Sequence, residues 1–126
     1  MSVGKEAGEF SFTSTGVTAS STPDGGASSQ VNVEGTATGF GAVIGTLTLY
    51  AAEAGANGGF VTWAGTGYLD GGETAGGQGR GVFEKSGTHK WRVRLVIQIT
   101  DGPLLLTDGE MSLEGRSYSG TIHQWE

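Results

Sequence analysis

Three side chains in the sequence have the chemistry to move a proton: Glu34, His89 and His123. The histidines are the only two in the chain, and an imidazole with a pKa of about 6.5 exchanges protons readily near neutral pH. Glu34 lies on the face opposite Val31 and Val33 in the segment QVNVEGTAT. If that face lines an apolar cavity, burial would raise the pKa of the carboxyl group and suit it to proton transfer. The sequence favours the plainer interpretation, in which Glu34 faces solvent.

The two histidines could also contribute to a metal site. With Glu34 or Glu110 they would supply enough ligands and leave open positions, as a catalytic metal requires. However, no His and Glu stand at the short spacing of a metal-binding motif, and the chain contains no cysteine. The glycine string GGQGRG does not open a helix after a strand and is not a phosphate loop. The sequence therefore predicts no metal and no cofactor.

Aromatic side chains form a second group of candidates, as the lining of a ligand site. They are Trp63, Trp91, Trp125, Tyr50, Tyr68 and Tyr118. In a small barrel such rings either fill the core or surround a planar apolar ligand, whose orientation the tyrosine hydroxyls would set. A ligand cavity needs small residues opposite large ones, and the glycines of this chain supply them.

Strands must position these candidates, because alternating runs of apolar and polar residues recur between turns rich in Gly, Asp and Ser. The expected strands are Glu9–Ala19, Gln30–Thr38, Val43–Ala51, Phe60–Leu69, Gly79–Lys85, Thr88–Thr100, Leu104–Leu113 and Arg116–Trp125. Asp108–Gly109 is either a bulge in the seventh or a further turn. Glycines inside strands permit the coiling that a closed sheet needs. The pattern predicts an all-β, antiparallel up-and-down β-barrel of about eight strands, with a filled interior or room for one small ligand.

The segment RGVFEKSGTHKWRVRLVIQI, residues 80–99, predicts one hairpin in detail. In its second half the odd-numbered residues are apolar and the even-numbered ones mostly polar, so one face is core and the other is solvated. A three-residue loop with Gly87 in the left-handed conformation would pair Glu84 with Thr88 and put His89 on the apolar face. The basic side chains would then form a solvated outer face with Glu84 as their counter-charge.

Length and charge limit the class of protein. The 126 residues suffice for one domain, residues 1–126, and the recurrent aromatic and β-branched residues indicate an ordered chain. A net charge of -6 leaves no broad basic surface, so we expect no nucleic-acid partner. The chain has neither an apolar run of signal-peptide length at its start nor one long enough to span a membrane. We therefore expect a cytoplasmic protein without a membrane partner.

The glycine and threonine pattern of the strands carries a resemblance to known barrels. The relevant stretches are VNVEGTATGFGAVIGTLTL, GGFVTWAGTGYLDGG, GQGRGVFEKSG and SLEGRSYSGTI. From about Gly8 onward the chain resembles small bacterial barrels similar to allene oxide cyclase, and a related bacterial family of unknown function. The resemblance implies a calycin-like, eight-stranded barrel around a mostly apolar cavity. No catalytic residue of the plant cyclases aligns with a position of this sequence, so the resemblance carries no enzymatic activity over to it.

Three hypotheses for function follow. The first is a non-catalytic barrel that binds a small, mainly apolar or aromatic molecule in its lumen. The second is a cofactor-free isomerase, cyclase or hydratase, in which Glu34, His89, His123 or a tyrosine moves a proton. The third is a solid-cored barrel that acts through its surface, for example as a homodimer joined at Ile44 and Val96. A titratable group with a displaced pKa inside a cavity favours the second, an aromatic cavity without one the first, and a filled interior the third.

Overall fold

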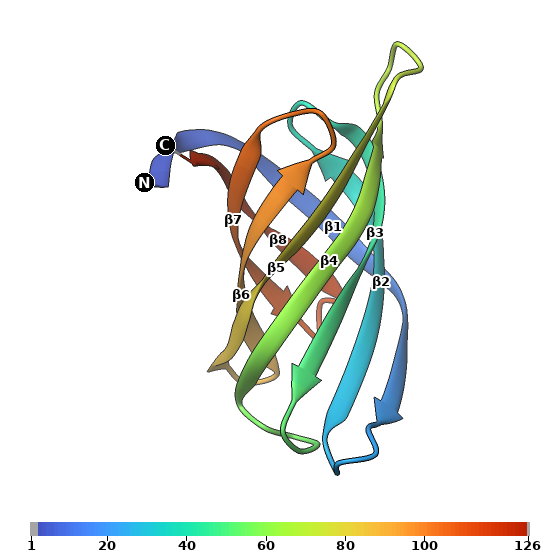
Figure 1. Ribbon diagram of the computed structural model, residues 1–126, viewed down its shortest axis with the longest axis vertical. Coiled ribbons are helices and arrows are strands. Elements are labelled where there is room, and N and C mark those ends of the chain that lie inside the picture. The colour runs from blue at the N-terminus through green and yellow to red at the C-terminus, as the bar shows by residue number, and fades with distance from the viewer. Residues whose placement is uncertain (1–2, 126) are drawn as a thin grey trace.

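The computed structural model describes residues 3–125 as one closed sheet. Eight antiparallel strands follow one another around the barrel in chain order, and no described residue is helical (Figure 1). They are β1 (Val3–Ser21), β2 (Ala27–Ala37), β3 (Gly41–Ala51), β4 (Gly58–Tyr68), β5 (Thr74–Gly87), β6 (Lys90–Ile99), β7 (Leu104–Ser112) and β8 (Ser117–Trp125). The predicted all-β up-and-down barrel is confirmed, although β1 and β5 begin several residues earlier than expected.

The barrel closes where β1 meets β8. Phe10 pairs with Gly120 and Phe12 with Tyr118, while the same part of β1 pairs with β2 along its other edge. Just before Gly16 the register between β1 and β2 shifts, and such a bulge bends a strand and increases its twist. Every strand therefore has two neighbours, and only the two ends of β1, before Glu9 and after Ser14, pair along one edge alone.

Alternate residues of each strand point into the barrel. On β3, for example, Val43, Leu47 and Leu49 are buried, whereas Ile44 between them is 58% exposed. The buried apolar residues of all the strands form a single core inside the barrel. The two-residue period of a β-strand thus produces an apolar lumen and a mostly polar outer wall.

Glycines on β3 and β4 make room for the largest ring of the interior. Trp63 lies flat against the wall, and a β-carbon added at Gly45 or Gly65 would collide with its indole. Trp63 is only 8% exposed, and its own strand neighbour Val61 is fully buried. The expected complementarity between bulky rings and glycine gaps is therefore present in the barrel wall.

The hairpin of β5 and β6 differs from the predicted register. Glu84 pairs with Arg92 instead of Thr88, and the turn is formed by Thr88 and His89. The prediction was wrong because it put a glycine in the left-handed position. In the structure His89 takes that conformation, with φ of 53°, and its ring contacts Glu114 of a neighbouring turn. The shift is by an even number of residues, so the other side chains stay on the faces expected for them.

Charged residues of β5, β6 and β7 lie on the outer face, as predicted for the basic side chains. Arg92 donates two hydrogen bonds to Asp108, at 2.9 and 2.6 Å, and Arg94 donates one to Glu84 at 3.4 Å. The hydrogen bonds from Arg92 lower the pKa of Asp108. The ladders on both sides of Asp108 are continuous, so Asp108–Gly109 is neither a bulge nor a turn.

The fit between Trp63 and its glycine can be tested by adding one methyl group. Gly45→Ala is expected to destabilise the protein by about 1–3 kcal/mol, because the new β-carbon must displace the indole. The measurement is urea denaturation followed by circular dichroism. Gly76→Ala is the matched control, since a β-carbon there meets only Thr100 Oγ1 at 3.5 Å, and it is expected to be neutral or stabilising. Equal stabilities of the two variants would contradict the packing described for Trp63.

Candidate functional site

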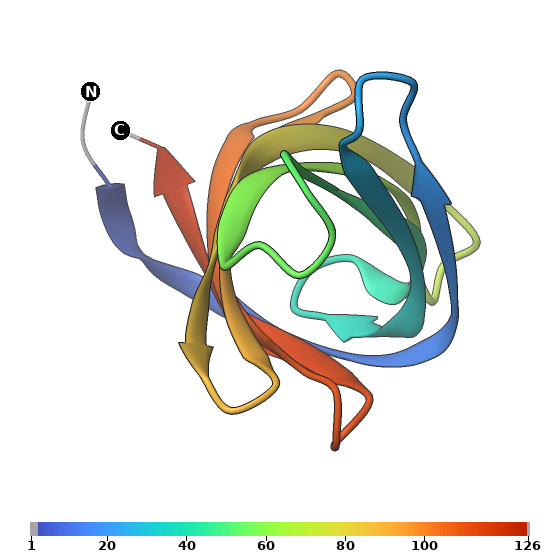
Figure 2. The same ribbon diagram turned by 90° about the horizontal axis from the view of Figure 1, so that it is seen from below.

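The lumen contains two cavities that meet at Tyr118. The first, which we call the mouth, is an open cavity of about 490 Å³ at the end of the barrel that carries the β1–β2, β3–β4 and β7–β8 turns. The second, the inner chamber, has a volume of about 70 Å³ and lies toward the opposite end. Tyr118 lines both. Figure 2 views the barrel from the mouth end, where the β3–β4 loop reaches across the opening.

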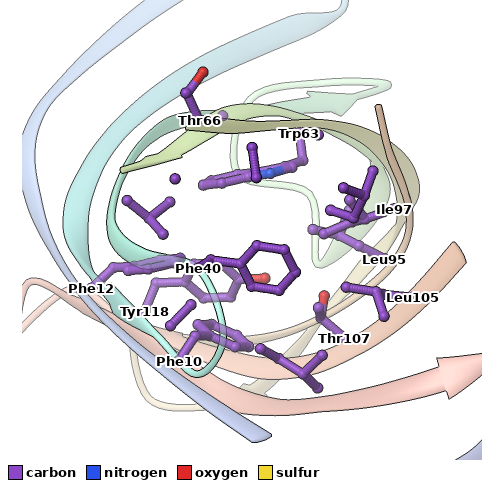
Figure 3. A pocket seen from close by; sticks show the side chains of 18 residues that line it. Phe10, Phe12, Phe40, Trp63, Thr66, Leu95, Ile97, Leu105, Thr107 and Tyr118 are labelled. Carbon is purple, nitrogen blue, oxygen red and sulfur yellow. The ribbon is translucent and has the colours of Figure 1, made fainter. Parts of the chain in front are cut away.

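Aromatic rings form one side of the inner chamber (Figure 3). Phe12 stacks on Trp63 with ring centroids 5.8 Å apart and planes 1° apart. Phe10 packs on Tyr118 with centroids 4.8 Å apart at an angle of 59°. Such pairs stabilise a fold by about 0.5–1.5 kcal/mol beyond the area they bury, so they hold this wall in place. The facing wall is aliphatic and includes Leu95, Ile97, Leu105 and Ile122.

A glycine on β7, Gly109, makes room for the ring of Tyr118. Gly109 of β7 pairs with Gly120 of β8, so neither strand places a side chain at this level of the wall. A β-carbon at Gly109 would lie 2.8 Å from Tyr118 Cε1 and 2.7 Å from Phe10 Cζ. The ring of Tyr118 can therefore lie along the wall only because glycine stands there.

Two hydroxyl groups interrupt the apolar surface of the inner chamber. Thr107 and Tyr118 are 6% and 2% exposed, and neither Thr107 Oγ1 nor Tyr118 OH has a hydrogen-bond partner among residues 3–125. Figure 3 shows both oxygens directed into the chamber, whereas the hydroxyl of Thr66 points away from it. A buried hydroxyl without a partner lowers the stability of the fold by about 1–3 kcal/mol. Two such groups in one cavity are unusual, because buried polar groups are nearly always hydrogen-bonded.

Burial raises the pKa of Tyr118 well above its ordinary value, and the nearby Thr107 hydroxyl acts in the opposite direction to a smaller extent. The two hydroxyls are thus close to each other without reaching hydrogen-bond geometry. At neutral pH the phenol keeps its proton and can donate it in a hydrogen bond. Ionisation of Tyr118 is less favourable in the folded state than in the unfolded chain, where its pKa is 10.0. The stabilisation that the protonated phenol gives is therefore fully present below pH 10.0, and it is lost as the pH rises through the raised pKa of the folded state.

Phe40 covers the inner chamber at the end opposite the mouth. It lies in the β2–β3 turn, where its backbone N donates to Ala37 O at 3.0 Å. Gly39 and Gly41 flank it with φ of 82° and 71°, values that glycine adopts without steric cost. The ring is half-buried and packs against the core. This short turn therefore brings an aromatic side chain back over the top of the chamber.

Apolar side chains line the walls of the mouth, and polar ones lie at its rim. The buried part of the wall is formed by Val31, Val33, Leu49 and Phe83, with half-buried Trp91 and Met111 beside them. The rim carries serines and two charged residues, Glu53 and Arg116. No described residue forms an ion pair with Arg116. The mouth thus offers an apolar cup with a hydrated edge.

Neither Glu34 nor His89 faces the lumen. Glu34 is exposed on the outer wall between Thr13 and Ile44, as the plainer interpretation of the sequence expected. His89, which was expected on the apolar face, is exposed in the β5–β6 turn because the register differs from the predicted one. Its hydrogen bond lowers the pKa of Glu114.

His123 lies on the face of β8 opposite Tyr118 and Ile122, and it is half-buried. Its ring contacts Thr121 Oγ1 at 2.9 Å and Gly4 O at 3.3 Å. The structure therefore does not bring the two histidines together across the lumen. Among residues 3–125, no group of three or more metal-binding side chains occurs.

Three of the six aromatic candidates lie in the lumen: Trp63, Trp91 and Tyr118. Tyr50 and Tyr68 are 44% and 48% exposed on the outer wall, and Trp125 shares the outward face of β8 with His123. The sequence-based set missed Phe10, Phe12, Phe40, Phe83 and Thr107. The available signal for the strand residues in this group was their alternation with polar residues. This alternation identifies luminal residues only when the inward face of each strand is known.

The two unpartnered hydroxyls lead to a stability test. Thr107→Val, which replaces the hydroxyl by a methyl group of similar shape, is expected to raise the free energy of unfolding by about 1 kcal/mol. The measurement is urea denaturation at neutral pH. Thr66→Val is the control, since its hydroxyl points away from the chamber, and it is expected to change stability little. A Thr107→Val protein less stable than the wild type would mean that the hydroxyl is satisfied.

Comparison with known proteins yields no match: the chain matches no protein-family model, no curated protein and no solved structure. In residues 3–125 there is also no helix with the length and apolar character needed to cross a bilayer.

Proposed function

We propose that this protein binds a small, mainly apolar or aromatic molecule in the lumen of its barrel. The observation that carries the proposal is the mouth, an open cavity of about 490 Å³ with apolar walls and Tyr118 at its floor. Ligand sites commonly have volumes of about 300–1,000 Å³ and are mostly apolar, with a few polar groups. The mouth has this size and this character.

Burial of apolar surface would drive binding. An apolar ligand would displace water from Phe83, Trp91 and Met111. The free energy of binding becomes more favourable by about 25 cal/mol for each Å² of apolar surface that is buried. Val17 and Leu113 are 58% and 54% exposed among the residues of the mouth, so apolar surface reaches the solvent. A polar group of the ligand could stay hydrated among the serines of the rim.

The architecture supports the same proposal. A closed antiparallel barrel of eight strands is consistent with a calycin-like fold. The resemblance of the strands to small bacterial barrels similar to allene oxide cyclase agrees with a ligand in the lumen, although it implies no catalysed reaction.

The other hypotheses have less support. Glu34, His89 and His123 all lie outside the lumen, so a proton-transfer reaction would have to use Tyr118. Tyr118 does have a displaced pKa, as the enzyme hypothesis requires, but burial raises that pKa further from neutrality, so the phenol keeps its proton and is poorly suited to act as a base. Ile44 and Val96 lie on β3 and β6, with β4 and β5 between them, so they do not form one continuous apolar patch. A homodimer joined at these two residues stays a prediction.

A neutral fluorescent ligand tests the proposal. N-phenyl-1-naphthylamine is expected to bind saturably, with increased fluorescence, because its rings suit an apolar aromatic cavity. Ala51→Trp is expected to weaken binding about tenfold or more, because Ala51 is half-buried in the mouth and the indole would occupy that space. The measurement is a fluorescence titration.

Ala64→Trp is the matched control, because Ala64 is exposed on the outer wall. It is expected to bind the probe like the wild type. Absence of saturable binding, or equal binding by all three proteins, would refute the proposal. Loss of binding in Ala64→Trp alone would place the binding site on the outer wall.

A further inference from the structure

We infer that the inner chamber binds a small neutral carbonyl group, with Thr107 and Tyr118 donating hydrogen bonds to its oxygen. The inference rests on the proposed function, since it names the chemical group that the lumen recognises. It is carried by the two hydroxyls that Figure 3 shows directed into the chamber.

Among residues 3–125, the hydroxyls of Thr107 and Tyr118 are the only buried side-chain polar groups without a hydrogen-bond partner, and both line the chamber. Both side chains are more than nine-tenths buried, and neither oxygen has a hydrogen-bond partner in the described chain. Buried polar groups are almost always paired, so an unpaired couple in one cavity indicates a missing partner. The oxygen of a carbonyl group has two lone pairs and can accept one hydrogen bond from each hydroxyl.

The lining of the chamber selects against charge. The described residues that form it include no Asp, Glu, Lys, Arg or His. An ionised ligand would lose its hydration there without gaining a counter-charge. The free energy of this desolvation is far larger than the stabilisation that two hydrogen bonds from neutral hydroxyls provide. Because burial also keeps the phenol of Tyr118 protonated, the chamber offers two neutral donors. A ketone or an aldehyde fits these donors, and a carboxylate does not.

The volume limits the size of the group. The chamber measures about 70 Å³, whereas an apolar cavity of about 150 Å³ holds benzene. By this comparison it admits roughly three non-hydrogen atoms, which is the carbonyl end of a larger apolar molecule such as 2-butanone. Gly109 leaves the space that the ring of Tyr118 occupies, and the ring packs against Phe10 and Phe12, so the hydroxyl is positioned before any ligand enters.

The test compares two ligands of the same shape. These are 2-butanone and 2-methyl-1-butene, in which a methylene group replaces the carbonyl oxygen. Each is titrated into protein with labelled methyl groups, and shifts are followed for Ile97 and Ile122 in the chamber and for Val31 and Leu49 in the mouth. Butanone is expected to shift the chamber methyls.

Variants isolate the two hydroxyls. Thr107→Val and Tyr118→Phe are each expected to weaken butanone binding about three- to tenfold, while binding of the alkene is unchanged or tighter. Thr107→Ser keeps the hydroxyl and is the matched control, with butanone binding retained. Methyl spectra of the unliganded variants verify that the barrel is intact.

Three results would overturn the inference. In the first, butanone binds both hydroxyl-free variants as tightly as the wild type. In the second, butanone shifts only the mouth methyls. In the third, a long-lived water is detected beside Thr107 and butanone shifts no chamber methyl, which would mean a structural water only. Failure of the proposed function gives a different result, because N-phenyl-1-naphthylamine would then also fail to bind the mouth.

Discussion

The pairing of β1 with β8 is the interaction on which the rest of the structure depends. It closes the sheet and brings Phe10 and Phe12 of the first strand against Tyr118 of the last. A barrel of about eight strands has an interior only wide enough for side chains or one small ligand. Large rings from opposite ends of the chain can share that space only where the wall behind them carries no side chain. The glycines at 45, 65 and 109 satisfy this requirement.

This arrangement leaves space inside the barrel instead of filling it. Because Trp63 and Tyr118 lie along the wall, their rings line the inner chamber and do not fill it. The two unpaired hydroxyls in that chamber reduce stability, and a valine or phenylalanine in their place would avoid the cost. Binding sites commonly retain groups that are unfavourable for folding alone. The position of this pair, at the centre of an otherwise apolar lumen, is the reason to assign it to a ligand.

Much of the fold could be predicted from the sequence, because strand alternation and glycine-rich turns are local signals. All eight strands were expected, and so was closure. The register of the β5–β6 hairpin was not predicted correctly, since the left-handed turn residue is His89 and its contact with Glu114 depends on the tertiary structure. The site was predicted only in part. Trp63 and Tyr118 were expected to contact a ligand, whereas Thr107 looks like any other strand threonine until its neighbours across the lumen are known.

The most direct test of an open, apolar lumen is a crystal structure of the protein under xenon pressure, because xenon enters dry apolar cavities and is visible in electron density. The expected result is xenon in the inner chamber between Trp63, Leu95 and Tyr118, with β1 paired to β8 as described. A lumen filled by side chains without xenon, or terminal strands that lie apart, would contradict the closed barrel and its ligand site together.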